Sequence, residues 1–313
     1  MTQLQLMRPR EREVEDAKIA RVPTTARRNR VWLPLWLLLP SILVLLAMQV
    51  YPAIYAAVIS FARVRRGELE FIGWRNYERL LNAPSFLSSL ERTLIYSVFY
   101  VLITLTLGIV LALLLNRRFK FTSLYLVLIF IPWVLSDVVT GTMWRWLFQP
   151  DYGILQEWLH NTFPYVSDAL FASRDGAMGI VIAASIWQAL AFATILALGA
   201  LQTVPQEVIE SAAIDGADRF QRFFSIILPI ARPTFLIMLL LLSIRAVNTA
   251  GLIFATTGGG PGDATTTASI YLVDVVKDQG EFGLGGAISV LLLGVNIILT
   301  VVYLSLFGRK VEA

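Results

Sequence analysis

The side chains that most often carry covalent chemistry are scarce in this sequence. Its 313 residues include no cysteine and one histidine, His160. These counts exclude a thiol nucleophile and a cysteine-based metal site, and they argue against a zinc site or a histidine-based triad. No pair of carboxylates stands out as a hydrolytic site. We therefore expect no catalytic residue and no metal ligand in this chain, and we interpret His160 as an ordinary loop residue.

The polar residues with functional potential lie inside long apolar runs. Arg145 lies near the end of one run, and Asp137 and Arg245 are the costly charges, because a charge inside such a run usually faces the interior of a helix bundle. They could pair with each other, which is a structural role, or line a polar pathway. Amides, hydroxyls and aromatic rings in the same runs suit a neutral solute rich in hydroxyl groups, although they could also form hydrogen bonds between helices. These further residues are Gln188, Asn248, Thr249, Trp144, Trp187 and Phe192.

Membrane-spanning helices must position these residues. The chain is 57% hydrophobic and 15% charged, whereas a soluble domain usually carries about 25% charged residues. A helix needs about 20 apolar residues to cross a bilayer. Six runs meet this length, and they are 31–60, 93–116, 122–148, 177–203, 233–257 and 284–307. We predict an all-α polytopic membrane protein with six transmembrane helices, in which a tail (1–30) precedes one transmembrane domain (31–310).

The distribution of basic residues predicts the orientation. Lys and Arg gather on the cytoplasmic side of membrane proteins. With both termini inside, the inner segments 1–30, 117–121, 204–232 and 308–313 hold about twice as many of them as the outer segments. The outer loop 61–92 weakens this pattern, because it contains Arg63, Arg65 and Arg66 among others. We predict an N-in, C-in topology, which also explains the basic pI without a nucleic-acid partner.

The segment 204–232 lies between the fourth and fifth runs and is polar. Thr203 can cap a helix that runs to about Asp215, and Gly216 can leave that helix in a left-handed conformation. Asp218 can cap a second helix, with Gln221 completing a capping box. A connecting loop needs only a few residues. We expect a helical hairpin that either docks on a partner or lies on the lipid headgroups.

This hairpin resembles the EAA motif of permeases from binding-protein-dependent ABC importers. The matching residues are Glu210, Ala212, Gly216, Ile226, Leu228 and Pro229, and Ser211 is the one departure. The stretches FIGWRNYERLL (71–81), RWLFQPDYG (145–153) and TTGGGPGDATTT (256–267) resemble segments of the carbohydrate-importing branch. The resemblance extends over residues 31–310.

The resemblance implies the type I ABC importer permease fold and a bacterial inner-membrane location. It implies that the loop 204–232 is a coupling helix that docks on an ATPase subunit. The coupling residues would be Glu207, Glu210, Ser211, Ala212, Ala213, Asp215, Gly216, Ala217 and Asp218. The implied partners are a second permease, two subunits that bind ATP and Mg²⁺, an extracytoplasmic solute-binding protein and a sugar such as trehalose or maltose. Maltose-type permeases place sugar contacts in the fifth span, which favours Asn248 and Thr249.

A glycine-rich loop, Gly258 to Gly262, follows the fifth run. It lacks the lysine of a Walker loop and is predicted to lie outside, so it cannot bind ATP in that way. ATP hydrolysis must therefore come from another polypeptide, and we expect no cofactor in this chain. Gly259, Gly260 and Pro261 form either a flexible turn or a loop near the docked binding protein.

Two other classes of function remain open from the residues alone. An ion-driven secondary transporter could use Asp137 as a proton or sodium site. An assembly or insertion factor would move no solute at all. An ATPase subunit that copurifies with this chain would favour the importer over both.

Overall fold

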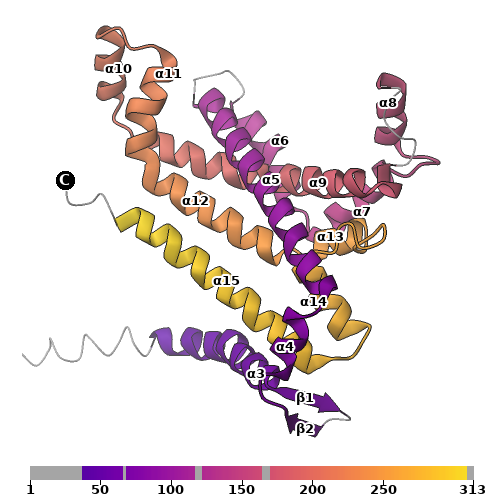
Figure 1. Cartoon of the computed structure of the whole chain (residues 1–313). Coiled ribbons are helices and arrows are strands. Elements are labelled where there is room, and N and C mark those ends of the chain that lie inside the picture. Colours follow the sequence, from indigo (N-terminus) through magenta and orange to yellow (C-terminus); the bar gives the residue numbers. More distant parts are fainter. Residues whose placement is uncertain (1–36, 66–67, 117–121, 164–169, 309–313) are drawn as a thin grey trace, which may run out of the picture. The chain divides into compact units, whose positions relative to one another are not determined.

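The computed structural model describes residues 37–65, 68–116, 122–163 and 170–308 (Figure 1). The predicted tail 1–30 lies outside the described residues. The chain forms two compact units, Met1–Tyr55 and Ala56–Ala313. Helix 37–45 continues through a π-helical turn, η2 (Leu46–Val50), into α3 (Tyr51–Ser60), and the first unit ends within α3. The π-helical turn ends two residues before Pro52, which has no N–H to donate to an i−4 carbonyl.

Within the described ranges, five helices are long and apolar enough to cross a membrane. They are Leu37–Ser60, α5 (Pro84–Leu115), α9 (Arg174–Gln202), the helix Arg219–Asn248 and α15 (Phe282–Gly308). A pair of shorter helices, α6 (Thr122–Val134) and α7 (Asp137–Leu147), gives a sixth span if the two are taken together. The prediction of a helical, multi-pass membrane protein is therefore confirmed, with two corrections to the spans.

The third predicted span, 122–148, is not one straight helix. The axes of α6 and α7 differ by 98° across the break at Leu135 and Ser136. Pro132 lies inside α6 and removes one helical hydrogen bond near its end. Ser136 then caps α7, because its hydroxyl accepts the N–H of Val139 at 3.3 Å. The prediction of a continuous span was wrong because the sequence restarts a helix at Ser136.

The fifth predicted span, 233–257, is also divided. Helix α12 (Leu228–Asn248) ends at Thr249, whose backbone is extended, and α13 (Gly251–Thr256) follows as a separate short helix. In the other direction, α12 is continuous with η4 (Phe223–Ile227) and α11 (Arg219–Arg222). The result is a 30-residue helix, Arg219–Asn248, that begins well before the predicted start.

The short helices that follow the two breaks, α7 and α13, pack closely on each other. A Cβ atom on Gly141 of α7 would lie 2.5 Å from the carbonyl oxygen of Leu252, and one on Gly251 would lie 3.3 Å from Cβ of Asp137. Only glycine allows the backbones of α7 and α13 to approach this closely. The two interrupted spans therefore meet through their short second halves.

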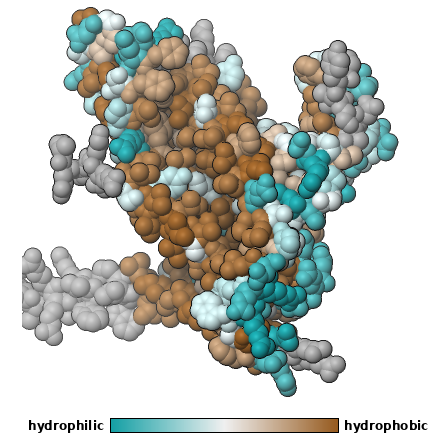
Figure 2. Space-filling model, viewed as in Figure 1, coloured by the Kyte–Doolittle hydropathy of each residue, from teal (hydrophilic) through white to brown (hydrophobic). Residues whose placement is uncertain are grey.

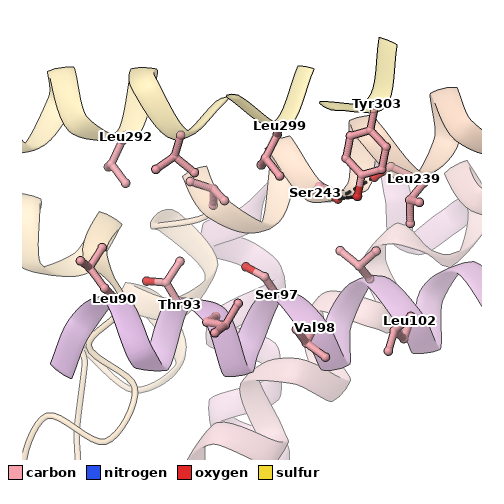
Figure 3. A pocket seen from close by; sticks show the side chains of 14 residues that line it. Leu90, Thr93, Ser97, Val98, Leu102, Leu239, Ser243, Leu292, Leu299 and Tyr303 are labelled. Atoms are coloured by element: carbon pink, nitrogen blue, oxygen red, sulfur yellow. Dashed lines mark hydrogen bonds between the residues drawn. The ribbon is translucent and has the colours of Figure 1, made fainter. Parts of the chain in front are cut away.

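The core of the second unit lies where α5 and α9 cross, and α12 packs on both. Alanines on the buried side of α9, such as Ala193 and Ala197, allow close helix packing. Much of the remaining surface of α5, α12 and α15 is apolar, as the brown area of Figure 2 shows. That surface is expected for helices that face lipid or other membrane helices.

Short elements connect the spans at their ends. Strands β1 (Ala62–Arg65) and β2 (Glu68–Phe71) pair antiparallel, and α4 (Arg75–Leu81) follows them. Helix α8 (Ile154–Thr162) and the 3₁₀ turn η3 (Leu170–Ala172) lie between α7 and α9, and α14 (Ala268–Lys277) precedes α15. Between α9 and α12, α10 (Gln206–Ile214) and α11 form the hairpin drawn in orange in Figure 1.

The crossing of α5 and α9 depends on Gly108. A Cβ atom at this position would lie 2.7 Å from Cβ of Ala193. We expect Gly108→Ala to lower the free energy of unfolding by about 1–3 kcal/mol through overpacking, measured as a lower melting temperature of the purified protein. Gly199→Ala in α9 is the matched control, because no atom lies within 4 Å of its added methyl group. Equal melting temperatures for both variants would contradict this packing.

Candidate functional site

The hairpin 204–232 has the predicted local structure. Helix α10 ends at Asp215, and Gly216 adopts a left-handed conformation with φ +85°. Asp218 accepts the N–H of Gln221 at 2.7 Å, and the Gln221 side chain accepts the N–H of Asp218 at 2.9 Å. Both capping-box bonds are therefore present, and they fix the start of α11 directly after the turn.

The start of α10 differs from the prediction. Thr203 directly follows the last residue of α9, and its hydroxyl donates to the carbonyl of Ala200 at 2.7 Å instead of capping α10. Pro205 precedes α10, and no side chain caps that helix. The prediction was wrong because Thr203 lies within reach of the unpaired carbonyls at the end of α9, where a hydroxyl can donate.

The hairpin exposes apolar side chains on a polar loop. Ile214 at the end of α10 is 87% exposed, and Phe220 of α11 is 77% exposed. Exposed apolar groups that are rimmed by polar residues mark surfaces that contact a partner. A shallow groove of about 410 Å³ lies beside them and is lined by Glu207, Val208, Ser211, Ala212, Asp215 and Ile226.

Four of the predicted coupling residues, Glu207, Ser211, Ala212 and Asp215, thus share one groove. Glu210 lies outside the groove lining, is exposed, and accepts a hydrogen bond from Nε2 of Gln206 at 3.2 Å. The remaining predicted residues, Ala213, Gly216, Ala217 and Asp218, form the end of α10 and the turn. The hairpin therefore offers both a groove and a protruding turn to a partner.

Asp137, Gln188 and Arg245 form one network. Nη2 of Arg245 lies 2.9 Å from Oδ1 of Asp137 and donates at 2.7 Å to Oε1 of Gln188. The amide nitrogen of Gln188 donates to the carbonyl of Leu135 at 2.9 Å. That carbonyl belongs to the break between α6 and α7, where it has lost its helical partner. The network therefore satisfies the break and ties α7, α9 and α12 together.

Two tyrosines beside this network were not predicted. Tyr96 and Tyr100 of α5 are fully buried, with ring centroids 5.7 Å apart. The hydroxyl of Tyr96 donates to Oγ of Ser185 at 2.9 Å, whereas the hydroxyl of Tyr100 has no hydrogen-bond partner among the described residues. The sequence gives little signal for them, because a tyrosine in an apolar run resembles any other large core residue.

The other predicted pathway residues divide into separate groups. The rings of Trp144 and Trp187 are 6.1 Å apart, and Phe192 stacks on Trp133 at 6.4 Å. The hydroxyl of Thr249 donates to the carbonyl of Arg245 and is buried.

Asn248 is exposed and bonds to Asn296 of α15, which was not predicted. Nδ2 of Asn248 donates to Oδ1 of Asn296 at 3.1 Å, and Nδ2 of Asn296 donates to Oδ1 of Asn248 at 3.3 Å. No direct contact brings the amide pair, the aromatic pairs and the ion pair together within the described residues.

The glycine-rich loop is held by threonines. Oγ1 of Thr266 donates to the carbonyl of Gly259, and Oγ1 of Thr265 donates to that of Gly260. Gly259 has φ +91°, and a Cβ atom there would lie 2.6 Å from Oγ1 of Thr266. A pocket of about 400 Å³ beside the loop is lined by Arg145, Gln149, Pro150, Phe171, Ala172, Thr256, Thr257, Gly260 and Pro261. No group of three or more His, Asp or Glu side chains in the described ranges could hold a metal ion.

The sequence of this chain is similar to those of known proteins. The family of binding-protein-dependent transport system inner membrane components matches residues 104–311. The trehalose/maltose transport system permease protein MalF of Thermococcus litoralis is 33% identical over 275 residues, which cover 87% of this chain and 92% of the relative. The sn-glycerol-3-phosphate transport system permease protein UgpA of Pectobacterium atrosepticum is 32% identical over 291 residues, with 90% and 96% covered.

A solved structure confirms the fold. One chain in the crystal structure of a bacterial alginate ABC transporter with its alginate pentasaccharide-bound periplasmic protein superposes with a TM-score of 0.79 at 20% identity. The match covers 93% of this chain and 99% of that chain. The chain described here therefore belongs to the binding-protein-dependent transport system inner membrane components, and it is a non-catalytic, multi-pass permease subunit of an ABC importer in the inner membrane.

Proposed function

We propose that this permease carries a neutral sugar, such as trehalose or a maltose-like disaccharide, into the cytoplasm. Relatives named for trehalose/maltose and for sn-glycerol-3-phosphate support a carbohydrate-like solute. The charge balance favours a neutral one, because Arg245 already pairs with Asp137 at 2.9 Å. Hydroxyl groups would then find their partners in exposed amides such as Asn248, with aromatic rings of Trp144, Trp187 and Phe192 as apolar surfaces.

The observation that carries this proposal is the continuity of the helix Arg219–Asn248. Its first turn is capped by Asp218 in the docking hairpin, and Arg245 near its last turn forms the ion pair with Asp137. At 1.5 Å per residue, Arg219 and Arg245 are roughly 40 Å apart along one helix axis. A displacement of the hairpin would be transmitted along this helix to the interrupted spans.

The proposed cycle is alternating access with both termini of the chain in the cytoplasm. Two partner subunits bind ATP and Mg²⁺, and their closure moves the hairpin 204–232. The helix Arg219–Asn248 then shifts against α5 and α9, and a second permease completes the pathway. An extracytoplasmic binding protein delivers the sugar near Gly259, Gly260 and Pro261. The predicted coupling residues act in this step as a docking surface and not as catalysts.

The ion-driven alternative requires a carboxylate that can bind and release a cation during transport. Asp137 is the candidate, and its charge is already balanced by Arg245. The importer proposal instead requires an ATPase partner for any uptake. Transport by this chain in vesicles without an ATPase subunit would favour the ion-driven transporter.

The hairpin generates the first functional prediction. Ile214→Asp places a charge on the most exposed apolar side chain of the hairpin. Loss of one interface hot spot costs about 2 kcal/mol, which weakens ATPase binding about thirtyfold. We expect copurification of the ATPase and sugar uptake to fall together, measured by pull-down and by uptake of labelled sugar in vesicles. Gln202→Asp, which is exposed at the end of α9, is the control.

Two further hairpin variants separate docking from coupling. Proline cannot adopt the φ of +85° at Gly216, so Gly216→Pro distorts the turn. Glu210→Lys reverses an exposed charge next to the groove. We expect ATP hydrolysis to continue while sugar uptake is lost, measured in reconstituted vesicles. Normal uptake in both variants would rule out a coupling role for this hairpin.

The ion pair generates a third prediction. Asp137→Asn leaves Arg245 without its carboxylate, so we expect a lower melting temperature and reduced uptake. Adding Arg245→Gln removes the unpaired charge, and the coupling free energy between the two positions should be about 0.5–3 kcal/mol. Thermal unfolding of both single variants and the double variant measures this value. Additive effects would show that the two residues do not interact in the membrane.

Uptake by the double variant then distinguishes two roles of the pair. If the pair is only structural, uptake should recover together with stability. If the pair also lines the pathway, stability should recover while uptake stays low. Asn248→Ala tests the amide contact separately, and unchanged sugar-stimulated ATP hydrolysis in that variant would exclude Asn248 from the pathway.

A further inference from the structure

The β1–β2 hairpin has two chemically different faces. Cross-strand partners in an antiparallel pair lie on the same face, and successive residues alternate between faces. One face is apolar, and its pairs are Ala62 with Phe71 and Val64 with Leu69. The other face is charged, and its pair of described side chains is Arg63 with Glu70. The hairpin is therefore amphipathic across its thickness.

The apolar face is largely uncovered. Phe71 is 79% exposed and Leu69 is 53% exposed, and Trp74, which follows the second strand, is 65% exposed. An isolated two-stranded hairpin is marginally stable in water. An exposed cluster of large apolar side chains on such an element indicates that something apolar covers it.

The hairpin is fixed at the ends of two membrane spans. β1 begins two residues after Ser60, the last residue of the first candidate span. Nδ2 of Asn76 in α4 donates to the carbonyls of Ser60 at 2.8 Å and Ala62 at 3.0 Å. Gly283, in the first turn of α15, lies directly against the carbonyl of Ala62, and a Cβ atom there would clash with it. The hairpin therefore lies at the level where apolar helices leave the hydrocarbon core.

This level is on the membrane face opposite the docking hairpin 204–232. Nη2 of Arg232, the last residue of the segment 204–232, donates to the carbonyl of Leu306 at 3.2 Å. Leu306 lies near the end of α15, and the β1–β2 hairpin packs at the start of α15. The length of α15 thus separates the two hairpins.

We propose that Leu69, Phe71 and Trp74 insert into the lipid headgroup layer on this face and anchor the permease there. All three side chains are large, apolar and exposed, and tryptophan favours the interface between headgroups and hydrocarbon. Arg75, which directly follows Trp74, is exposed and can donate to lipid phosphates. This role also accounts for an arginine-rich loop on the side where basic residues are otherwise few.

A lipid surface explains the two faces better than a protein partner does. A hairpin that lies flat on the headgroups buries its apolar face and keeps the charged face, with Arg63 opposite Glu70, in water. The anchor would hold the ends of the first span and α15 at a fixed depth while other helices move.

The absence of cysteine from the sequence allows a direct test. Phe71→Cys and Glu70→Cys place one label on each face of the same strand. The assembled transporter, with cysteine-free partner subunits, is labelled with an environment-sensitive fluorophore and reconstituted in phospholipid nanodiscs. Lipids with a nitroxide near the headgroup quench labels in the interface, and iodide quenches labels in water. Both variants must retain uptake.

We expect the label at 71 to be quenched several-fold more by the nitroxide lipid than the label at 70, and several-fold less by iodide. Leu69→Cys and Glu68→Cys should repeat the result one pair further along β2. Equal iodide quenching on both faces would overturn the proposal. Protection at 71 that appears only after the solute-binding protein is added would also overturn it, because the face would then belong to a protein partner.

Discussion

The contact between Arg245 and Asp137 allows this chain to interrupt a helix inside a membrane. Lipid offers no hydrogen bonds, so a broken helix needs side-chain partners for its freed backbone groups. The carbonyl of Leu135 accepts from Gln188, and the amide oxygen of Gln188 accepts from Arg245. Asp137, in the first turn of α7, balances the charge of the arginine. Each residue of this network forms a hydrogen bond or an ion pair with the next one. Removal of any one of them therefore leaves a polar group without a partner in a half-buried site.

The same network connects the long helix of the hairpin 204–232 to the interrupted spans. Arg245 lies on the long helix that begins in the hairpin, and it holds that helix to the start of α7. Helix α7 in turn packs on α13 through Gly141 and Gly251, where no side chain separates the backbones. The interruptions in the third and fifth spans are thus coupled, both by the ion pair and by close packing. A movement of the long helix must either carry α7 and α13 along or break the ion pair.

The sequence predicts local chemistry well and helix interruptions poorly. Gly216 and the capping box of Asp218 were predictable, because both depend on residues a few positions apart. The break at Ser136 was missed because hydropathy is the same for a straight span and for two apolar halves. A signal was present, since Pro132 is followed by a serine and an aspartate that can begin a helix. Gln188 and Arg245 were predicted as polar sites, but their shared partners come from distant segments.

The proposed preference for a neutral sugar depends on which polar side chains of the spans can still form hydrogen bonds with a solute. Gln188 uses both ends of its amide inside the network, and Thr249 donates to its own helix. Asn248 and Asn296 bond to each other on an exposed surface, and one N–H of Asn296 has no partner in the described part of the chain. A hydroxyl group of the solute can replace one of these amide–amide hydrogen bonds at little cost in free energy, because a hydroxyl both donates and accepts. An anionic solute would instead compete with Asp137 for Arg245 and release the interrupted span. Under the proposed function, the ion pair would disfavour charged solutes because its arginine is occupied, and the amide pair would bind the neutral sugar.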